Sequence, residues 1–155
     1  MRSIPDISVK RVGDAVQGEL IRASVYGSPA LGFLTSTKIA DSSQTLGLWL
    51  ELAGDRSEPE LRYVEDDANC MSYGDDWAIE PEMSNLFAYS RDACVMLHRS
   101  AGWLLRSATV RSQFGWFSIT DGRKVETASR NDAVFFTSYR ITVAAGLHRE
   151  TEVFA

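Results

Sequence analysis

The fold is decided by residues 93–144, which read ACVMLHRSAGWLLRSATVRSQFGWFSITDGRKVETASRNDAVFFTSYRITVA. Apolar and aromatic runs dominate this stretch, namely ACVML, GWLLRSATV, GWFSIT and VFFTSYRITVA. Residues of these types are enriched in β-strands, so the runs predict successive strands with the rest of the chain closing around them. Many short strands at close spacing predict a mainly β fold, an antiparallel sandwich or barrel.

Residues 93–110 also fit a helix, because apolar residues recur there at helical spacing and Ser90 would cap it. In that case Gly102 would lie mid-helix, at a cost of about 1 kcal/mol relative to alanine. Residues 100–102 read equally well as a turn between the strands CVMLHR and WLLRSATV. We favour two strands, because the residues that follow are also strand-like. The alternative is an α+β fold with a long helix near residues 84–108.

One short helix is predicted near residues 81–89. Pro81 suits the first helical position, and Met83, Leu86 and Phe87 would share one face.

Residues 45–52 form the clearest strand, with four leucines at every second position. Leu46, Leu48, Leu50 and Leu52 would point to one side, as in a half-buried strand. Residues 61–65 are expected to pair back on this strand.

Two features are expected between residues 117 and 144. Around Asp121 and Gly122, a three-residue loop with a left-handed Gly122 would put Phe117 opposite Val125, because this register pairs apolar residues.

Residues 134–144 are then expected to continue as one strand.

The 155 residues, with 45% hydrophobic composition, predict a single domain over residues 1–155. No apolar run approaches the roughly 18 residues that span a bilayer, and the N-terminus lacks a secretory apolar region. Cys70 and Cys94 are too few for a disulfide framework. These features predict a reduced, cytoplasmic protein of bacterial type. The net charge of −5 argues against binding to a nucleic-acid backbone.

Charge is distributed unevenly along the chain. Residues 51–82 contain eleven acidic residues and two arginines, whereas residues 83–149 contain nine basic and four acidic residues. An acidic loop is expected over residues 66–76, and its candidate partner-binding side chains are Glu65, Asp66, Asp67, Asp75 and Asp76. Their order does not match a calcium-binding EF-hand, so we expect a solvated loop or one that contacts arginines, and no metal.

An Arg/aromatic group in the C-terminal half is the second candidate binding element. Aromatic rings and guanidinium groups together can stack on a planar ligand or form an interface hot spot. The candidate residues are Trp103, Arg106, Arg111, Phe114, Trp116 and Tyr139.

Cys94 and His98 are the one pair with the residue types of a nucleophile and its base. On a helix, residues four apart are neighbours, but on a strand they lie about 13 Å apart, too far to share a proton. The strand interpretation therefore predicts no catalytic residue, and no sequence motif predicts a cofactor.

Two hypotheses for function follow. The first is a non-enzymatic β-sheet binding module that self-associates, as a dimer, or binds a protein partner, with the acidic loop of one copy meeting the Arg/aromatic face of another. The alternative is a small-molecule-binding barrel or small enzyme, with a cavity lined by Trp103, Trp116, Phe117 and Tyr139.

Overall fold

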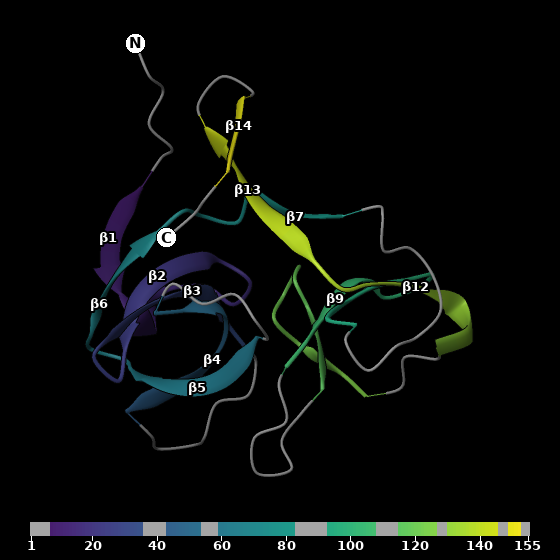
Figure 1. Ribbon diagram of the computed structural model, residues 1–155. Helices are drawn as coiled ribbons and strands as arrows, with labels where there is room; N and C mark the ends of the chain where they lie inside the picture. Colours follow the sequence, from purple (N-terminus) through teal and green to yellow (C-terminus); the bar gives the residue numbers. More distant parts are fainter. Residues whose placement is uncertain are drawn as a thin grey trace.

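The computed structural model describes residues 7–35, 43–53, 59–82, 93–107, 115–126, 130–145 and 149–152 (Figure 1). Strands dominate these residues, so the predicted mainly β fold is confirmed. The strands are β1 (Ser8–Arg11), β2 (Leu20–Val25), β3 (Ser28–Leu34), β4 (Gln44–Leu52), β5 (Glu60–Glu65), β6 (Asn69–Ser72), β7 (Trp77–Pro81), β8 (Val95–His98), β9 (Gly102–Arg106), β10 (Trp116–Ser118), β11 (Lys124–Val125), β12 (Ala133–Phe136), β13 (Tyr139–Ala145) and β14 (Arg149–Glu152). Short 3-10 turns occur at η1 (Val12–Asp14) and η3 (Arg130–Asp132).

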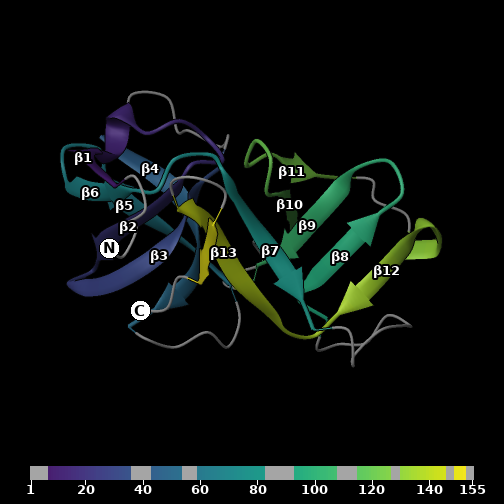
Figure 2. The same ribbon diagram turned by 90° about the horizontal axis from the view of Figure 1, so that it is seen from above.

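The strands form three antiparallel sheets, which Figure 2 shows from above. The first sheet has the order β1-β6-β2-β3-β4-β5, the second β11-β10-β9-β8-β12 and the third β14-β13-β7. The first sheet curls so far that η1 meets the turn after β5, where the Gly13 N–H donates to the Asp66 carbonyl oxygen at 2.8 Å. The third sheet lies between the other two in this view.

In the first sheet, β3 and β4 are buried on both faces along most of their length. Inside its curl, Trp49, Ile21 and Val64 belong to one apolar cluster. On the outer face, Leu31 and Phe33 join a larger cluster, whose members in the other two sheets include Leu105 of β9 and Ile141 of β13. We call this larger cluster the shared core, because all three sheets contribute to it.

The strand expected at residues 45–52 is β4, and β5 pairs with it as predicted. Two details of that prediction were wrong. The strand is buried on both faces rather than one, and Leu52 does not lie beside Leu48 and Leu50. The pairing with β3 shifts between Leu31 and Gly32, and the extra residue of this bulge moves Leu52 to the inner face.

Residues 95–106 form the β8–β9 hairpin, so the two-strand interpretation is confirmed and the alternative of a helix over residues 84–108 is wrong. Left-handed Gly102 (φ 74°) begins the second strand, a conformation that an interior helical residue does not adopt. The short helix expected near residues 81–89 mostly lies outside the described residues, but Pro81 ends strand β7 and is not a helix start.

The register predicted for the β10–β11 hairpin was wrong. Trp116, not Phe117, lies opposite Val125, and residues 119–122 form a longer loop than expected. The reason is that Phe117 faces the shared core, whereas Trp116 and Val125 pack together on the opposite face of the sheet. The left-handed conformation predicted for Gly122 is confirmed, with φ at 72°.

The single strand expected at residues 134–144 is in fact two strands in two sheets. β12 pairs with β8 in the second sheet, and β13 pairs with β7 in the third. The chain crosses between the sheets at Thr137 and Ser138. Phe135 and Phe136 are both buried, on opposite faces of β12, so continuous hydrophobicity conceals the break in the sequence.

Candidate functional site

One open feature of the described residues is a split in the first sheet between β2 and β6. These strands pair only at Ile21 with Ser72 and at Arg22 with Met71. On its other side, β2 stays paired with β3 as far as Val25. Beyond Arg22, therefore, β2 and β6 diverge and leave a gap in the sheet.

The gap forms a groove with a volume of about 420 Å³ on the outer face of the sheet. Its size is within the range of ligand-binding sites. Residues of four strands and of the β2–β3 turn form its walls, and its floor is the point where β2 and β6 separate. The residues that line this split groove are Val9, Arg22, Ala23, Ser24, Gly27, Pro29, Asn69, Cys70 and Met71.

Two apolar side chains at the rim of the split groove are exposed. Val9 of β1 lies opposite Met71 of β6, and their exposed fractions are 75% and 37%. Both share a sheet face with Arg22 and Leu31, which are paired along the same row. Leu31 belongs to the shared core, where the other two sheets cover the outer face of the first sheet. The groove therefore lies where this apolar face is no longer covered.

Main-chain groups of Ser24 face the split groove. The turn between β2 and β3 has two residues, so Val25 and Ser28 exchange hydrogen bonds and Ser24 directs its N–H and C=O toward the β6 side. Opposite Ser24 is Pro29, which has no N–H to donate. Within the described residues, no backbone hydrogen bond occupies these two groups of Ser24.

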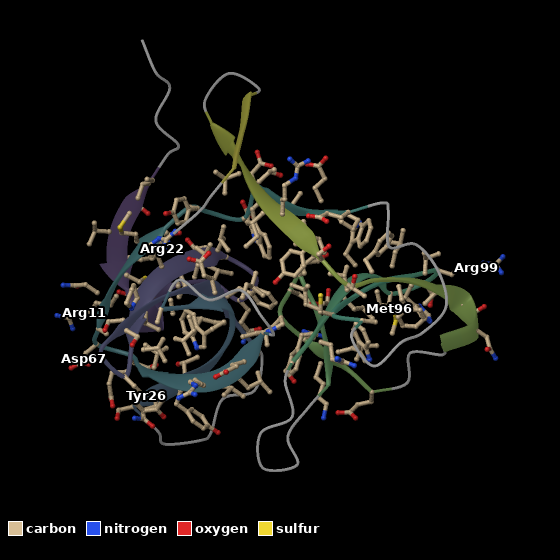
Figure 3. All side chains as sticks on the ribbon, in the orientation of Figure 1. Arg11, Arg22, Tyr26, Asp67, Met96 and Arg99 are labelled. Carbon is tan, nitrogen blue, oxygen red and sulfur yellow. The ribbon has the colours of Figure 1, made fainter. Side chains whose placement is uncertain are left out.

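Arg22 gives the split groove its positive charge. Its Nε lies 3.3 Å from the Tyr73 hydroxyl, which holds the guanidinium on the outer face (Figure 3). Among the described residues that line the groove, none is acidic. Arg22 is thus the only charged side chain among the described residues that line the groove.

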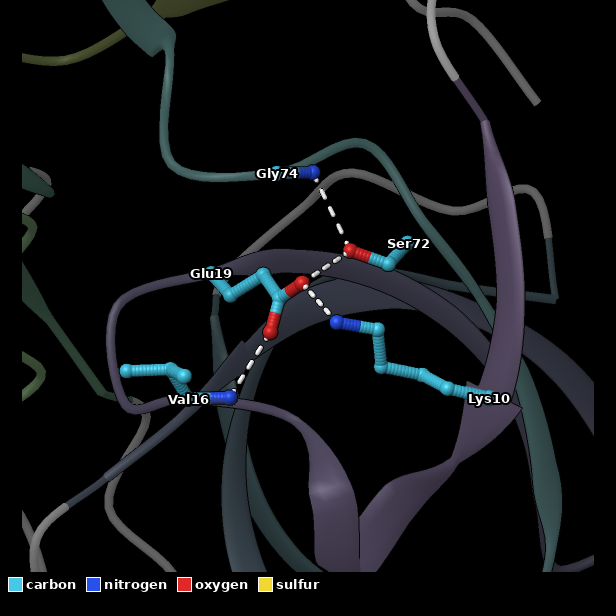
Figure 4. Close-up of polar contacts among 5 residues, drawn as sticks. All are labelled: Lys10, Val16, Glu19, Ser72 and Gly74. Atoms are coloured by element: carbon cyan, nitrogen blue, oxygen red, sulfur yellow. Dashed lines mark hydrogen bonds and ion pairs between the residues drawn. The ribbon is translucent and has the colours of Figure 1, made fainter.

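Behind the split groove, a buried Glu19 ties β1 and β6 to the start of β2 (Figure 4). The Lys10 Nζ lies 2.7 Å from Glu19 Oε1, and the Ser72 hydroxyl donates to the same oxygen. The Val16 N–H donates to Oε2 at 2.7 Å, while the Gly74 N–H donates to the Ser72 oxygen at 3.1 Å. Both strands of the β1–β6 rim are thus attached to one carboxylate.

The charges of this network are mutually stabilised. Burial by itself raises the pKa of Glu19, but hydrogen bonds from Lys10, Ser72 and the Val16 N–H outweigh burial and lower it. The pKa of Lys10 is raised, chiefly by its hydrogen bond to Glu19. Glu19 and Lys10 are therefore charged partners at neutral pH.

Cys70 lies at the floor of the split groove and is 3% exposed. Burial, and then the negative charge of Glu19, raise the pKa of its thiol. A thiol with a raised pKa is a poor nucleophile at neutral pH, so Cys70 fits a structural role.

The described members of the predicted Arg/aromatic group do not form one surface. Arg106 lies opposite Trp116, so both are on one face of the second sheet, and Trp103 is on the other face. Trp103 contacts Phe136 with ring centroids 5.8 Å apart, while Trp116 contacts Phe135 at 6.0 Å. Tyr139 packs against the shared core.

Arg111 and Phe114 lie outside the described residues. Phe117 is buried in the shared core. Of the four aromatic residues expected to line one cavity, Trp103, Phe117 and Tyr139 pack at the shared core, whereas Trp116 lies on the opposite face of the second sheet.

The expected acidic loop is two separate turns, because β6 occupies the middle of residues 66–76. Before β6, Glu65 accepts a hydrogen bond from the Gln44 side chain at 2.7 Å, and Asp66 accepts one from the Thr45 hydroxyl. Asp67 is exposed beside them, and Asp75 and Asp76 are exposed after β6. Within the described residues, no group of three or more His, Cys, Asp or Glu side chains could hold a metal ion.

His98 and Cys94 have separate structural roles. The Nδ1 of His98 accepts the backbone N–H groups of Ser100 and Ala101 at 3.2 and 3.1 Å, which fixes the β8–β9 turn. The Cys94 thiol donates to the Thr137 carbonyl oxygen at 3.3 Å. The strand between them places them at opposite ends of β8.

Sequence reasoning missed the split groove and Glu19. Val9, Arg22 and Met71 come from three strands, and their proximity depends on β6 lying between β1 and β2. The alternation of residues 7–10 indicates a strand, but no local pattern indicates that this strand is an edge or that β6 diverges from β2. For Glu19, no signal in the sequence distinguishes this carboxylate from the exposed ones.

The fold and the groove describe an all-β protein with an open site in one of three antiparallel sheets. No protein-family model, curated protein or solved structure matches the chain. Among the described residues, no helix is long and apolar enough to cross a membrane.

Proposed function

We propose that the chain is a non-enzymatic β-sheet binding module that holds a protein partner on the split groove. The observation that carries this proposal is the apolar rim, where Val9 is 75% exposed on an edge strand opposite Met71. Exposed apolar residues that adjoin an open groove are typical of interaction sites.

The position of the rim at an edge supports the same proposal. β1 ends the first sheet, and within the described residues its outer side has no backbone partner. An unpaired edge can accept another strand, so natural proteins usually protect it. Here a partner would cover Val9 and the free edge together.

We also propose a cytoplasmic location and self-association as part of this function. Cys70 and Cys94 are buried and are not joined in a disulfide, which suits a reducing compartment. A second copy of the chain is one candidate partner. The proposed contact between the acidic turns and an arginine of another copy is a second route to a dimer.

The experiment is a selection of randomised peptides displayed on phage against the immobilised chain. The wild type should enrich a set of related sequences, and Val9→Lys should not, because a lysine at the rim places a charge where the partner's apolar side chain would pack. Val134→Lys is the matched control, since Val134 is a 38% exposed valine on β12, the edge strand of the second sheet.

Equal enrichment by the wild type and Val9→Lys would show that the rim is not the binding surface. A chain that enriches no sequence and stays monomeric at all concentrations would contradict the proposed function.

A further inference from the structure

We propose that the partner at the rim is a second copy of the chain, whose β1 pairs antiparallel with β1 of the first copy about a twofold axis at Val9. This inference rests on the proposed function and names its partner. The first sheets of the two copies would then join edge to edge into one continuous sheet. β1 lies at the margin of the molecule, where a second copy can approach it (Figure 1).

The main chain of β1 presents two residues to the open side of the sheet. Just beyond β1, the Val12 N–H donates to the Ala68 carbonyl oxygen at 2.9 Å, which continues the β1–β6 register. Hydrogen-bonded positions alternate along an antiparallel strand, so Lys10 also pairs with β6, whereas Val9 and Arg11 direct their N–H and C=O groups outward. Among the described residues, no backbone group bonds to these outward groups. An added strand would satisfy them.

The side chains at this edge are apolar and exposed on the outer face. Val9 has the largest exposed fraction among the described large hydrophobic residues, and it lies opposite Met71. Ile7, which is 39% exposed, directly precedes β1 and shares a face with Val9 where the backbone stays extended. In the proposed dimer the two copies of Val9 would lie side by side, with a Met71 beyond each, and this apolar row would leave water.

The register centred on Val9 uses every outward-facing group of the edge. Val9 would pair with Val9 of the second copy, and Ile7 of each copy would pair with Arg11 of the other. Each of these residues carries both an N–H and a C=O, so each pair can exchange two hydrogen bonds.

The two neighbouring registers are less favourable. A twofold axis at Lys10 would put the two lysines directly opposite each other, and like charges at that spacing are destabilising. An axis at Ser8 would put Arg11 opposite Pro5, which has no N–H to donate. The short strand buries less surface than a permanent dimer does, so we expect a transient dimer.

Cysteine trapping tests the partner and the register together. The α-carbons of an antiparallel hydrogen-bonded pair are about 5.5 Å apart, a distance that a disulfide bridges. Oxidised glutathione should therefore link Val9→Cys into a covalent dimer on a non-reducing gel. Arg11→Cys should not link to itself, because its two α-carbons would be about 13 Å or more apart. A mixture of Arg11→Cys and Ile7→Cys chains should link.

Two controls account for chance collisions and for the native thiols. Val134→Cys places a thiol on the edge strand of the second sheet, and it should link about tenfold more slowly than Val9→Cys, because no pairing holds its thiols together. The wild type should not link, since Cys70 and Cys94 are buried.

Val9→Pro tests the main-chain pairing without an added thiol. Proline removes the outward N–H but none of the hydrogen bonds to β6, and edge strands tolerate proline at such positions. Analytical ultracentrifugation should show association weakened about tenfold or more, because each dimer loses two hydrogen bonds. Val9→Thr is the matched control, which keeps the N–H and should weaken association less. Thermal unfolding shows whether each variant is folded, and the cysteine result does not depend on the proline variant.

Failure of this inference and of the proposed function would look different. If Val9→Cys links no faster than Val134→Cys while the phage selection still depends on Val9, the rim binds a different protein and the second copy is the wrong partner. Self-linking of Arg11→Cys, or association of a folded Val9→Pro equal to that of the wild type, would overturn the proposed pairing of β1 strands. If the selection enriches nothing that depends on Val9 and no dimer forms, both proposals are wrong.

Discussion

Gly122 lies directly against the main chain of Leu34, so a β-carbon at residue 122 would come within 2.3 Å of the Leu34 carbonyl oxygen. This contact joins the β10–β11 loop of the second sheet to the end of β3 in the first. A similar contact exists nearby, where a β-carbon on Gly18 would lie 2.5 Å from the Thr120 carbonyl oxygen. The two sheets therefore meet backbone to backbone at places where only glycine fits.

Replacing Gly122 with alanine should destabilise the protein more than an ordinary glycine substitution does. The left-handed conformation costs about 1–2 kcal/mol for alanine, and displacing the Leu34 backbone should add about 1–3 kcal/mol. Gly27→Ala is the matched control, because Gly27 has a φ of 79° but a β-carbon added there would meet nothing within 4 Å. Urea unfolding of both variants measures the difference, and equal losses would show that the loop does not dock on β3.

The Glu19 network should make stability depend on pH at the acid end. The folded pKa of Glu19 is lowered by its hydrogen bonds despite burial, so its contribution is fully present above the unfolded pKa and is lost as pH falls through the folded pKa. Glu19→Gln should cost about 1–3 kcal/mol at neutral pH. The difference in free energy of unfolding between the wild type and the variant should disappear as the pH is lowered below the ordinary pKa range of a glutamate.

The control for this experiment is Glu80→Gln. Glu80 pairs with Arg140 across β7 and β13 at 3.0 Å, but both side chains are about half exposed. A pair of this kind contributes between about 0 and 1 kcal/mol. Urea unfolding at a series of pH values should show a smaller loss of stability for Glu80→Gln than for Glu19→Gln. If the loss for Glu19→Gln stayed unchanged into acid, it would contradict the network.

Cys70 should react slowly with alkylating reagents in the folded protein. Burial and the charge of Glu19 raise the pKa of its thiol, so less thiolate is present at mildly alkaline pH. In a Cys94→Ser variant, mass spectrometry should find Cys70 unmodified by iodoacetamide under native conditions and fully modified in denaturant. Rapid modification of the native chain would mean that the groove floor is open to reagents.

Self-association is expected to depend on the rim and on salt. Light scattering over a range of protein concentrations should detect a dimer that Val9→Lys weakens and Val134→Lys leaves intact. High salt should strengthen a contact dominated by apolar packing and weaken one formed by acidic turns and arginines. A monomer at every concentration and salt would contradict self-association and leave a different protein as the partner.

Much of the strand content could be predicted from local patterns. The alternation of Leu46, Leu48 and Leu50 identified β4, and Gly102 favoured the β8–β9 hairpin over a helix. Local patterns failed where a strand is buried on both faces. Phe135 and Phe136 continue an apolar run up to a change of sheet, and the adjacent aromatics Trp116 and Phe117 gave no basis for choosing the register.

The candidate site was less predictable because it depends on which strands become neighbours. Asn69–Ser72 has no alternating apolar pattern, so the sequence predicts an acidic loop where the structure has β6. Without β6, nothing in the sequence places Met71 beside both Val9 and Arg22. Likewise, closeness in sequence predicts one surface for Trp103 and Arg106, although the pleat places them on opposite faces of the sheet.

The third sheet pairs β7 with β13, although the whole second sheet is encoded between them. During synthesis, β7 leaves the ribosome long before its partner exists, and pairings between distant segments form slowly. Until β13 arrives, the nascent chain exposes a strand edge and apolar residues of the shared core, and chaperones recognise such states, which also aggregate. A premature stop before residue 139 would therefore send the product to proteolysis rather than yield a shorter working protein.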